Sequence, residues 1–300
     1  MLRRFLPYMS AAAVLALTSS SAHAQITHLE TVMDGASEVP PVVTNGTGRA
    51  DYVLNTFTHT LKFNVSFQNL TSAENNAHIH VTSSTAILFP LPLGSPIFGS
   101  LTTSPGQEAT ILLPNGTYTN IHTTMHPGGE IRGTNVLSPV VGTKLCFGDG
   151  TSGPCPCGNN GAAGHGCENS ISTGGSVLEA TGHVSPDNVV LIATGERATA
   201  LSIFLQGNAM LSPAVVFGDG LRCTGGQLKR LSTKSAAGGA IAYPEGAEQS
   251  ITVRAAALGQ PNNPGDTRWY QTYYRDPDPV FCPNPPGNTF NISNAVQITW

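Results

Sequence analysis

Charged residues are scarce in this sequence, and no part of it is strongly basic. Asp, Glu, Lys and Arg make up 11% of the 300 residues, and the formal net charge is −4. Such a chain lacks the positive surface that binds nucleic acid, and it has no basic amphipathic helix for a membrane surface. We therefore expect no nucleic acid among its partners.

Long apolar runs are also absent beyond the N-terminus. The chain opens with Arg3 and Arg4 close to its start, followed by an apolar run up to Leu17 and small residues up to Ala24. This order is typical of a secretory signal peptide over residues 1–24. Cleavage after Ala24 removes two positive charges, so the net charge of −4 becomes −6. We expect a secreted or extracytoplasmic protein, in the periplasm or at the cell surface, with no transmembrane segment.

Cysteine is missing from the first 145 residues. The six cysteines of the chain are Cys146, Cys155, Cys157, Cys167, Cys223 and Cys282. An even number in an exported chain predicts disulfides, and their uneven placement predicts a domain boundary just before Cys146. We expect one domain at residues 25–138, held together by core packing alone, and a second at residues 139–300.

The disulfide pairing can be narrowed by geometry. Cys155 and Cys157 are separated by one proline, which does not suit the geometry that a disulfide between them would need. We expect these two to pair with Cys146 and Cys167, leaving Cys223 with Cys282. A zinc site built from four cysteine thiolates is the alternative, and an exporting compartment favours disulfides.

What the chain does have in quantity is turn-forming residues and short alternating apolar runs. It contains 33 Gly and 22 Pro, and Leu61, Phe63, Val65 and Phe67 alternate with polar residues, as in a half-buried antiparallel strand. A hairpin is expected around residues 55–59. Other strands are expected at residues 77–81, 109–113, 118–123, 130–134, 188–193, 200–206, 214–217, 250–255, 268–274 and 290–300. This pattern predicts an all-β protein, with an N-terminal Greek-key sandwich or barrel and a C-terminal disulfide-stapled β-sandwich.

Histidines supply the clearest candidate site. Alternate side chains of a strand share a face, so His78 and His80 point the same way. On a distant strand, His122 shares its face with Tyr118 and Asn120. Neutral imidazoles suit copper and zinc, so we consider a metal site of His78, His80 and His122, with His126 or Glu130 as a fourth ligand.

A purely structural interpretation of the same histidines is the alternative. Glu130 and Arg132 share a face, and a hydrogen-bonded network of histidine, Glu130 and Arg132 would stiffen the sheet without any metal. Glu38 could join the histidines, but the prolines that follow it favour an extended edge or turn segment.

Five motifs of the first domain occur in an order that resembles the CHRD domain, the module repeated in chordin and found singly in exported bacterial proteins. They are Ser37-Glu38-Val39-Pro40-Pro41-Val42, Thr47-Gly48-Arg49-Ala50, Ala77-His78-Ile79-His80, Tyr118-Thr119-Asn120-Ile121-His122-Thr123 and Pro127-Gly128-Gly129-Glu130-Ile131-Arg132-Gly133. The resemblance implies an extracellular β-domain, and we do not transfer the growth-factor binding of chordin to it.

A second, independent likeness concerns the histidines. A His-x-His strand with a distant third histidine resembles the copper-ligand layout of Cu/Zn superoxide dismutase, a Greek-key barrel. Such a barrel or an immunoglobulin-like sandwich is the fold we expect for the first domain. The chain departs from the dismutase pattern because it has no bridging histidine, no zinc loop and no disulfide in this domain.

The second half resembles a domain of unassigned function in exported bacterial proteins that contain a Cys-Pro-Cys-Gly-Asn element, here residues 155–159. No nucleophile elbow, phosphate loop or zinc-protease helix occurs in the chain. We therefore expect a non-catalytic extracellular binding or surface-associated protein, with a protein or polysaccharide partner. The alternative is a copper- or zinc-binding protein centred on the three histidines, which could be redox-active.

Overall fold

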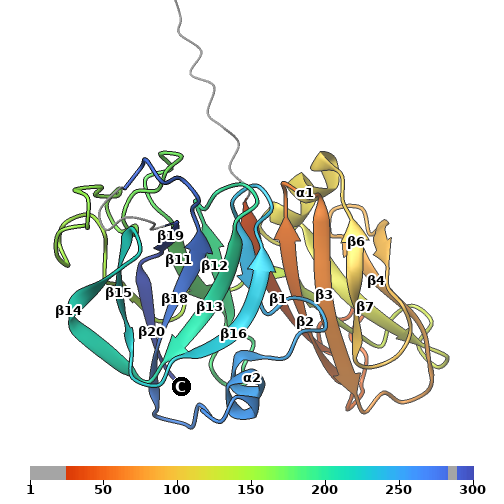
Figure 1. Ribbon diagram of the computed structural model, residues 1–300. Helices are drawn as coiled ribbons and strands as arrows, with labels where there is room; N and C mark the ends of the chain where they lie inside the picture. Colours follow the sequence, from red (N-terminus) through yellow and green to blue (C-terminus); the bar gives the residue numbers. More distant parts are fainter. Residues whose placement is uncertain (1–24, 283–288) are drawn as a thin grey trace, which may run out of the picture.

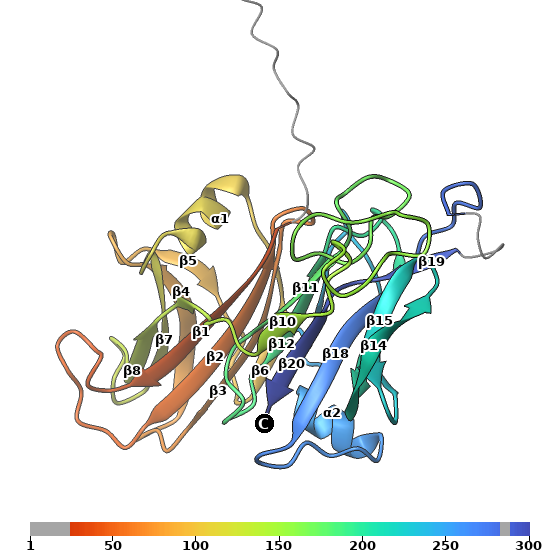
Figure 2. The same ribbon diagram turned by 90° about the vertical axis from the view of Figure 1, so that its left-hand side faces the viewer.

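The computed structural model describes residues 25–282 and 289–300, and the predicted signal peptide lies outside these residues. Two β-rich parts lie side by side (Figures 1 and 2). We call residues 25–137 the N-terminal barrel and residues 143–300 the C-terminal part. The elements of the barrel are β1 (Ile26–Asp34), β2 (Thr47–Asn55), β3 (Thr60–Gln68), β4 (Glu74–Val81), β5 (Ile87–Pro90), β6 (Ile97–Thr102), α1 (Pro105–Leu112), β7 (Thr117–Thr123), β8 (Ile131–Thr134) and β9 (Val136–Leu137).

One nearly closed sheet forms the barrel, as the alternation predicted. Its strands follow the order β5-β4-β7-β8-β1-β2-β3-β6, and β9 pairs with β1. Strands β1, β2 and β3 are consecutive antiparallel neighbours, whereas β8 returns from far along the chain to lie beside β1. A late strand placed beside the first of a meander is the Greek-key arrangement.

The interior of the barrel is apolar. Leu61, Phe63 and Val65 of β3 are each at most 1% exposed, and Ile79 and Ile121 join them from β4 and β7. Fully burying such a side chain contributes roughly 1.5–3 kcal/mol. Residues of the opposite parity on the same strands therefore form the outer surface of the barrel.

The prediction of a strand at residues 109–113 is wrong. Residues 109–112 belong to α1, which lies at one end of the barrel, and Leu113 caps its C-terminus (Figures 1 and 2). Ser104 caps the helix: its hydroxyl accepts from the Gln107 backbone N–H, and the Gln107 side chain accepts from the Ser104 N–H. This reciprocal capping, with Pro105 in the first turn, specifies a helix start.

The described residues of the C-terminal part form eleven strands, arranged as sheets of six, three and two strands, and one short helix. Its elements are β10 (Thr143–Leu145), β11 (Val177–Thr181), β12 (Val190–Thr194), β13 (Leu201–Gly207), β14 (Ala209–Phe217), β15 (Gly220–Gly225), β16 (Lys229–Ser235), β17 (Ile241–Tyr243), α2 (Ile251–Ala257), β18 (Thr267–Arg275), β19 (Phe290–Ile292) and β20 (Ala295–Thr299). Its main core is formed by apolar residues from both larger sheets and α2.

Two sequence predictions for this part need correction. Residues 250–255 were expected as a strand but form the start of α2, where Ile251 and Ala255 are buried while Val253 is 52% exposed. A strand would have put all three on one face, whereas a helix places residues four apart together. The expected strand at residues 290–300 is divided into β19 and β20, and Trp300 packs into the core as expected.

All six cysteines form disulfides, but only part of the expected pairing is correct. The bonds join Cys146 to Cys223, Cys155 to Cys167 and Cys157 to Cys282. The prediction that Cys223 pairs with Cys282 is wrong, because β15 carries Cys223 next to Cys146 while the chain after β18 brings Cys282 to Cys157. Pairing depends on how distant strands fold together, and sequence spacing does not contain that information.

The barrel and the C-terminal part share an apolar contact. Ile26 and Val53, from the outer face of β1 and β2, pack with Val190 and Ile192 of β12 and with two alanines near β17. Lys62 of the barrel also forms an ion pair with Glu245, with 2.9 Å between Nζ and Oε2.

Among the described residues, no helix has the length and apolar character needed to cross a membrane.

Candidate metal centre

Strands β4 and β7 place three histidines on the outer face of the barrel. His78 lies opposite Asn120 in the antiparallel register, and His80 lies opposite Tyr118. His122 is two residues further along β7, and it therefore has the same parity as Asn120. Although they are on the outer face, the three imidazole side chains belong to residues that are only 8–9% exposed.

The three rings converge. One nitrogen from each of His78, His80 and His122 lies within 4.8 Å of the other two, and they are the one such group among the described histidines, cysteines and acidic residues. Three atoms within 4.8 Å of one another all lie within about 2.8 Å of a common point, at most about 0.8 Å farther than a His–metal bond of about 2.0–2.1 Å, so an ion would draw the rings slightly together. The Nδ1 atom of His78 is 3.1 Å from Nε2 of His122, a hydrogen bond in which His78 donates and which a bound ion would replace with two nitrogen–metal bonds.

Main-chain carbonyls orient two of these rings. Nδ1 of His80 lies 2.9 Å from the Thr85 carbonyl oxygen, and Nδ1 of His122 lies 3.1 Å from the Pro127 carbonyl oxygen. A carbonyl can only accept, so each Nδ1 carries the proton and each Nε2 keeps its lone pair. Histidines that bind metals are commonly held in this way, with the second ring nitrogen donating to a carbonyl.

The environment of His78 and His122 lowers the pKa of both rings. The pKa of His78 is lowered mainly by burial and further by the nearby rings of His122 and His80. Burial also lowers the pKa of His122, against the hydrogen bond to Pro127, which acts to raise it. Neutral imidazole is the form that binds metal, so the lowered pKa values of His78 and His122 favour metal binding near pH 7.

Tyr118 supports the ring of His80. The two rings stack with 4.8 Å between their centroids and 9° between their planes. The guanidinium carbon of Arg132 lies 4.2 Å from the centre of the Tyr118 ring. Because β4 and β8 flank β7, the imidazole and the guanidinium approach this ring from opposite sides. Arg132 is thus connected to His80 through the ring of Tyr118.

Glu130 has a different role from the one considered in the sequence. Its carboxylate accepts hydrogen bonds from Thr44, Thr71 and Thr123, and none of these bonds involves a histidine. Burial alone would raise the pKa of Glu130, but these bonds outweigh it and lower the pKa. Glu130 therefore ties together the loops around the site.

His126 lies outside the group of three histidines. It belongs to the turn after β7, where its backbone N–H donates to the Thr123 hydroxyl at 3.2 Å and its carbonyl accepts from the Gly129 N–H. The turn positions Pro127 as the partner of His122, and this is the contribution of the segment to the site.

Glu38 lies on the same outer face of the barrel as the histidines. The sequence favoured an edge or turn segment at Glu38 over a place beside them. Glu38 is 4% exposed. A Cβ atom added to Gly129 would lie 2.6 Å from both Glu38 Oε1 and the Asn120 amide, so the three residues meet there. Burial raises the pKa of Glu38 to about 7, against the charge of Arg132, which lowers it. Its position depends on the path of residues 35–46, for which alternation gives no signal.

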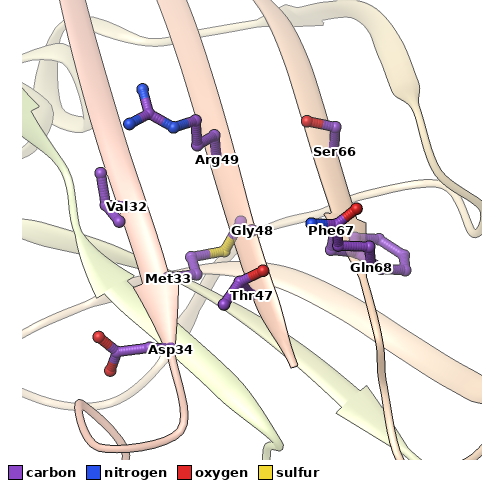
Figure 3. Close-up of a pocket in the computed structure, with 9 residues that line it drawn as sticks. All are labelled: Val32, Met33, Asp34, Thr47, Gly48, Arg49, Ser66, Phe67 and Gln68. Carbon is purple, nitrogen blue, oxygen red and sulfur yellow. The ribbon is translucent and has the colours of Figure 1, made fainter. Parts of the chain in front are cut away.

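A separate cavity of about 370 Å³ lies on the sheet of β1, β2 and β3 (Figure 3). Arg49, Asp34 and Gln68 are among the residues that line it. None of the three histidines does so, and the cavity is thus distinct from the metal centre.

Comparison with known proteins agrees with the resemblance found in the motifs. Residues 29–134 match the family model of the CHRD domain, and this match runs from within β1 to the end of β8 and includes all three histidines. The chain therefore contains a CHRD domain. No curated protein and no solved structure matches the chain significantly.

Proposed function

We propose that the protein is an exported metal-binding protein, in which His78, His80 and His122 hold a copper or zinc ion. The observation that carries this proposal is the orientation of His80. His80 belongs to the converging group, and its Nδ1 is engaged by Thr85, while its buried Nε2 has no hydrogen-bond partner among the described residues. A structural network would satisfy this nitrogen, whereas a metal ion uses its lone pair.

The donor set indicates which metals fit. Three neutral imidazoles suit both zinc and copper, and divalent copper binds nitrogen ligands more tightly than zinc does. The 3.1 Å between His78 Nδ1 and His122 Nε2 is close to the separation of two nitrogens on one tetrahedral ion, about 3.3 Å for bonds of about 2.0 Å.

The compartment supports the same proposal. Three disulfides in the C-terminal part fit an oxidising environment, where copper and zinc meet little competition from free thiols. We propose that residues 1–24 are a cleaved signal peptide and that the protein acts in the periplasm, at the cell surface or in the medium. We also propose the domain boundary between β9 and β10, and an extracellular protein or polysaccharide as the partner.

Elemental analysis of the purified protein tests the metal. We expect one equivalent of copper or zinc per chain, or one equivalent bound when metal-free protein is titrated with either ion. His80→Ala should lower the affinity by at least tenfold, since it removes one of three ligands. His126→Ala, in the neighbouring turn, is the matched control and should bind like the wild type. Equal binding by the His80 variant would overturn the proposal.

A further inference from the structure

Several buried polar atoms of the described barrel lack a partner, and three of them belong to residues at or beside the histidine group: Nε2 of His80, Oδ1 of Asn120 and Oε1 of Glu38. A buried polar atom that lacks a partner costs roughly 1–3 kcal/mol, so such atoms are rare in folded proteins. The proposed metal accounts for the nitrogen of His80. It does not account for the two oxygens, which accept hydrogen bonds and have no donor.

The two oxygens belong to residues that surround the histidines. Asn120 lies directly opposite His78 across the β4–β7 pair and two residues from His122 on the same face. Facing residues of an antiparallel pair have Cβ atoms about 4.5–5.5 Å apart. Glu38 meets the Asn120 side chain above Gly129, where a Cβ would lie 2.6 Å from either residue. Only glycine leaves this space free, and the φ of Gly129 is +127°.

The charges at this position are balanced. Arg132 is the residue opposite Asn120 on the other neighbour, β8, and its positive charge acts on both Glu38 and Tyr118. The Gly35 carbonyl accepts from the Glu38 N–H at 3.2 Å, which fixes the start of the loop, and Thr44 near its end donates to Glu130. The loop is therefore tied at both ends, and the carboxyl group of Glu38 is held over the site.

We propose that the ion keeps one coordination position open, and that Asn120 and Glu38 bind the ligand that occupies it. This inference rests on the proposed metal site. The ligand coordinates through oxygen and donates O–H hydrogen bonds to the two orphaned acceptors. Water has this chemistry, and so does a small hydroxylated molecule in its place. Three protein ligands with a fourth exchangeable one are typical of reactive metal sites, whereas structural zinc sites use four protein ligands.

Azide binding to the copper(II)-loaded protein tests the open position. Azide is a small anion that replaces an exchangeable ligand on copper(II) and produces a charge-transfer absorption band. We expect saturable binding of one azide per copper in the wild-type protein at pH 8. Glu38→Gln keeps the size of the side chain but removes a negative charge close to the anion, so azide should bind roughly tenfold more tightly. Glu179→Gln, on β11 of the C-terminal part, where the carboxylate pairs with Lys144, should bind azide like the wild type.

The outcomes separate this inference from the proposed function. If the wild-type protein takes up no copper, the metal proposal itself fails. If copper binds at one equivalent but azide produces no new band, the fourth position is closed and this inference is overturned. If azide binds but Glu38→Gln leaves its affinity within twofold of the wild type, Glu38 does not adjoin the open position. Copper content and the circular dichroism spectrum of each variant show that it is folded and loaded.

A pair of glycine variants gives a second readout. Gly129→Ala places a methyl group where Glu38 and Asn120 meet, so it should displace them and tighten azide binding, as Glu38→Gln does. Gly128→Ala in the same turn meets no atom within 4 Å and should leave azide binding unchanged. Equal azide affinity in the two variants would contradict the placement of the ligand against Glu38 and Asn120.

Discussion

The orientation of two of the three imidazoles, those of His80 and His122, depends on a carbonyl group that lies outside the strand carrying it. Strand parity placed His78 and His80 on one face, and His122 on the face it shares with Tyr118 and Asn120. Parity does not tell which ring nitrogen points inward, because Thr85 and Pro127, which engage Nδ1 of His80 and His122, belong to loops. The candidate ligands could therefore be predicted from the sequence, whereas their donor atoms could not.

Asp219 provides a residue-scale prediction in the C-terminal part. It is fully buried, and neither oxygen of its carboxyl group has a hydrogen-bond partner in the part of the chain that the structure describes. The pKa of Asp219 is raised to about 7, mainly by burial and further by the charge of Asp276. In an unfolded chain the pKa of an aspartate is roughly 3.9. The folded state therefore holds the proton more tightly, and stability falls as the pH rises from about 4 to about 7.

Asp219→Asn removes this loss because the amide does not ionise. We expect the variant to melt at a higher temperature than the wild type at pH 8, with the difference shrinking towards pH 4. Asp149→Asn is the contrasting control. Hydrogen bonds from Thr151 and Gly164 lower the pKa of Asp149, so its carboxylate stabilises the fold above its unfolded pKa, and that variant should lose stability at pH 8. A lower melting temperature for Asp219→Asn at pH 8 would show that the Asp219 carboxylate is stabilised in the folded state.

At the scale of elements, alternation identified most strands but failed at both helices. Residues 109–113 and 250–255 have apolar residues at strand-like spacing, yet α1 and α2 form there. For α1 the signal was present in the sequence, since Ser104, Pro105 and Gln107 form a capping box with a proline in the first turn. For α2 no side chain caps the start, and the burial of Ile251 and Ala255 against the sheets decides the element.

The capping of α1 leads to an element-scale prediction. Ser104→Ala removes the hydroxyl that accepts from the Gln107 N–H, and we expect a loss of about 1 kcal/mol in the free energy of unfolding. Denaturant unfolding followed by circular dichroism measures this loss. Ser104→Asp keeps an accepting oxygen at the cap and should retain most of the stability. If both variants lose the same amount, the cap contributes nothing and the effect comes from another contact of Ser104.

At the scale of the whole molecule, contacts between distant segments decide what local sequence cannot. The disulfide from Cys157 to Cys282 spans 125 residues, and its pairing depends on the complete fold of the C-terminal part. The contact between the two parts is of the same kind. Val53 is an outward-facing residue of β2, yet it is only 4% exposed because Val190 and Ile192 cover it. Alternation alone predicts such a residue to be exposed to solvent.

This contact predicts how the molecule unfolds. Polar contacts add to the apolar ones, since Asn188 donates to Glu30 and Asp51, and we expect the wild-type protein to melt in one calorimetric transition. Val53→Asp places a carboxylate among apolar side chains and should weaken the interface by roughly 3 kcal/mol, separating the transition into two. Val32→Asp, on the same sheet but 60% exposed, is the matched control and should leave one transition. A single unchanged transition for Val53→Asp would mean that the two parts unfold together for a reason other than this interface.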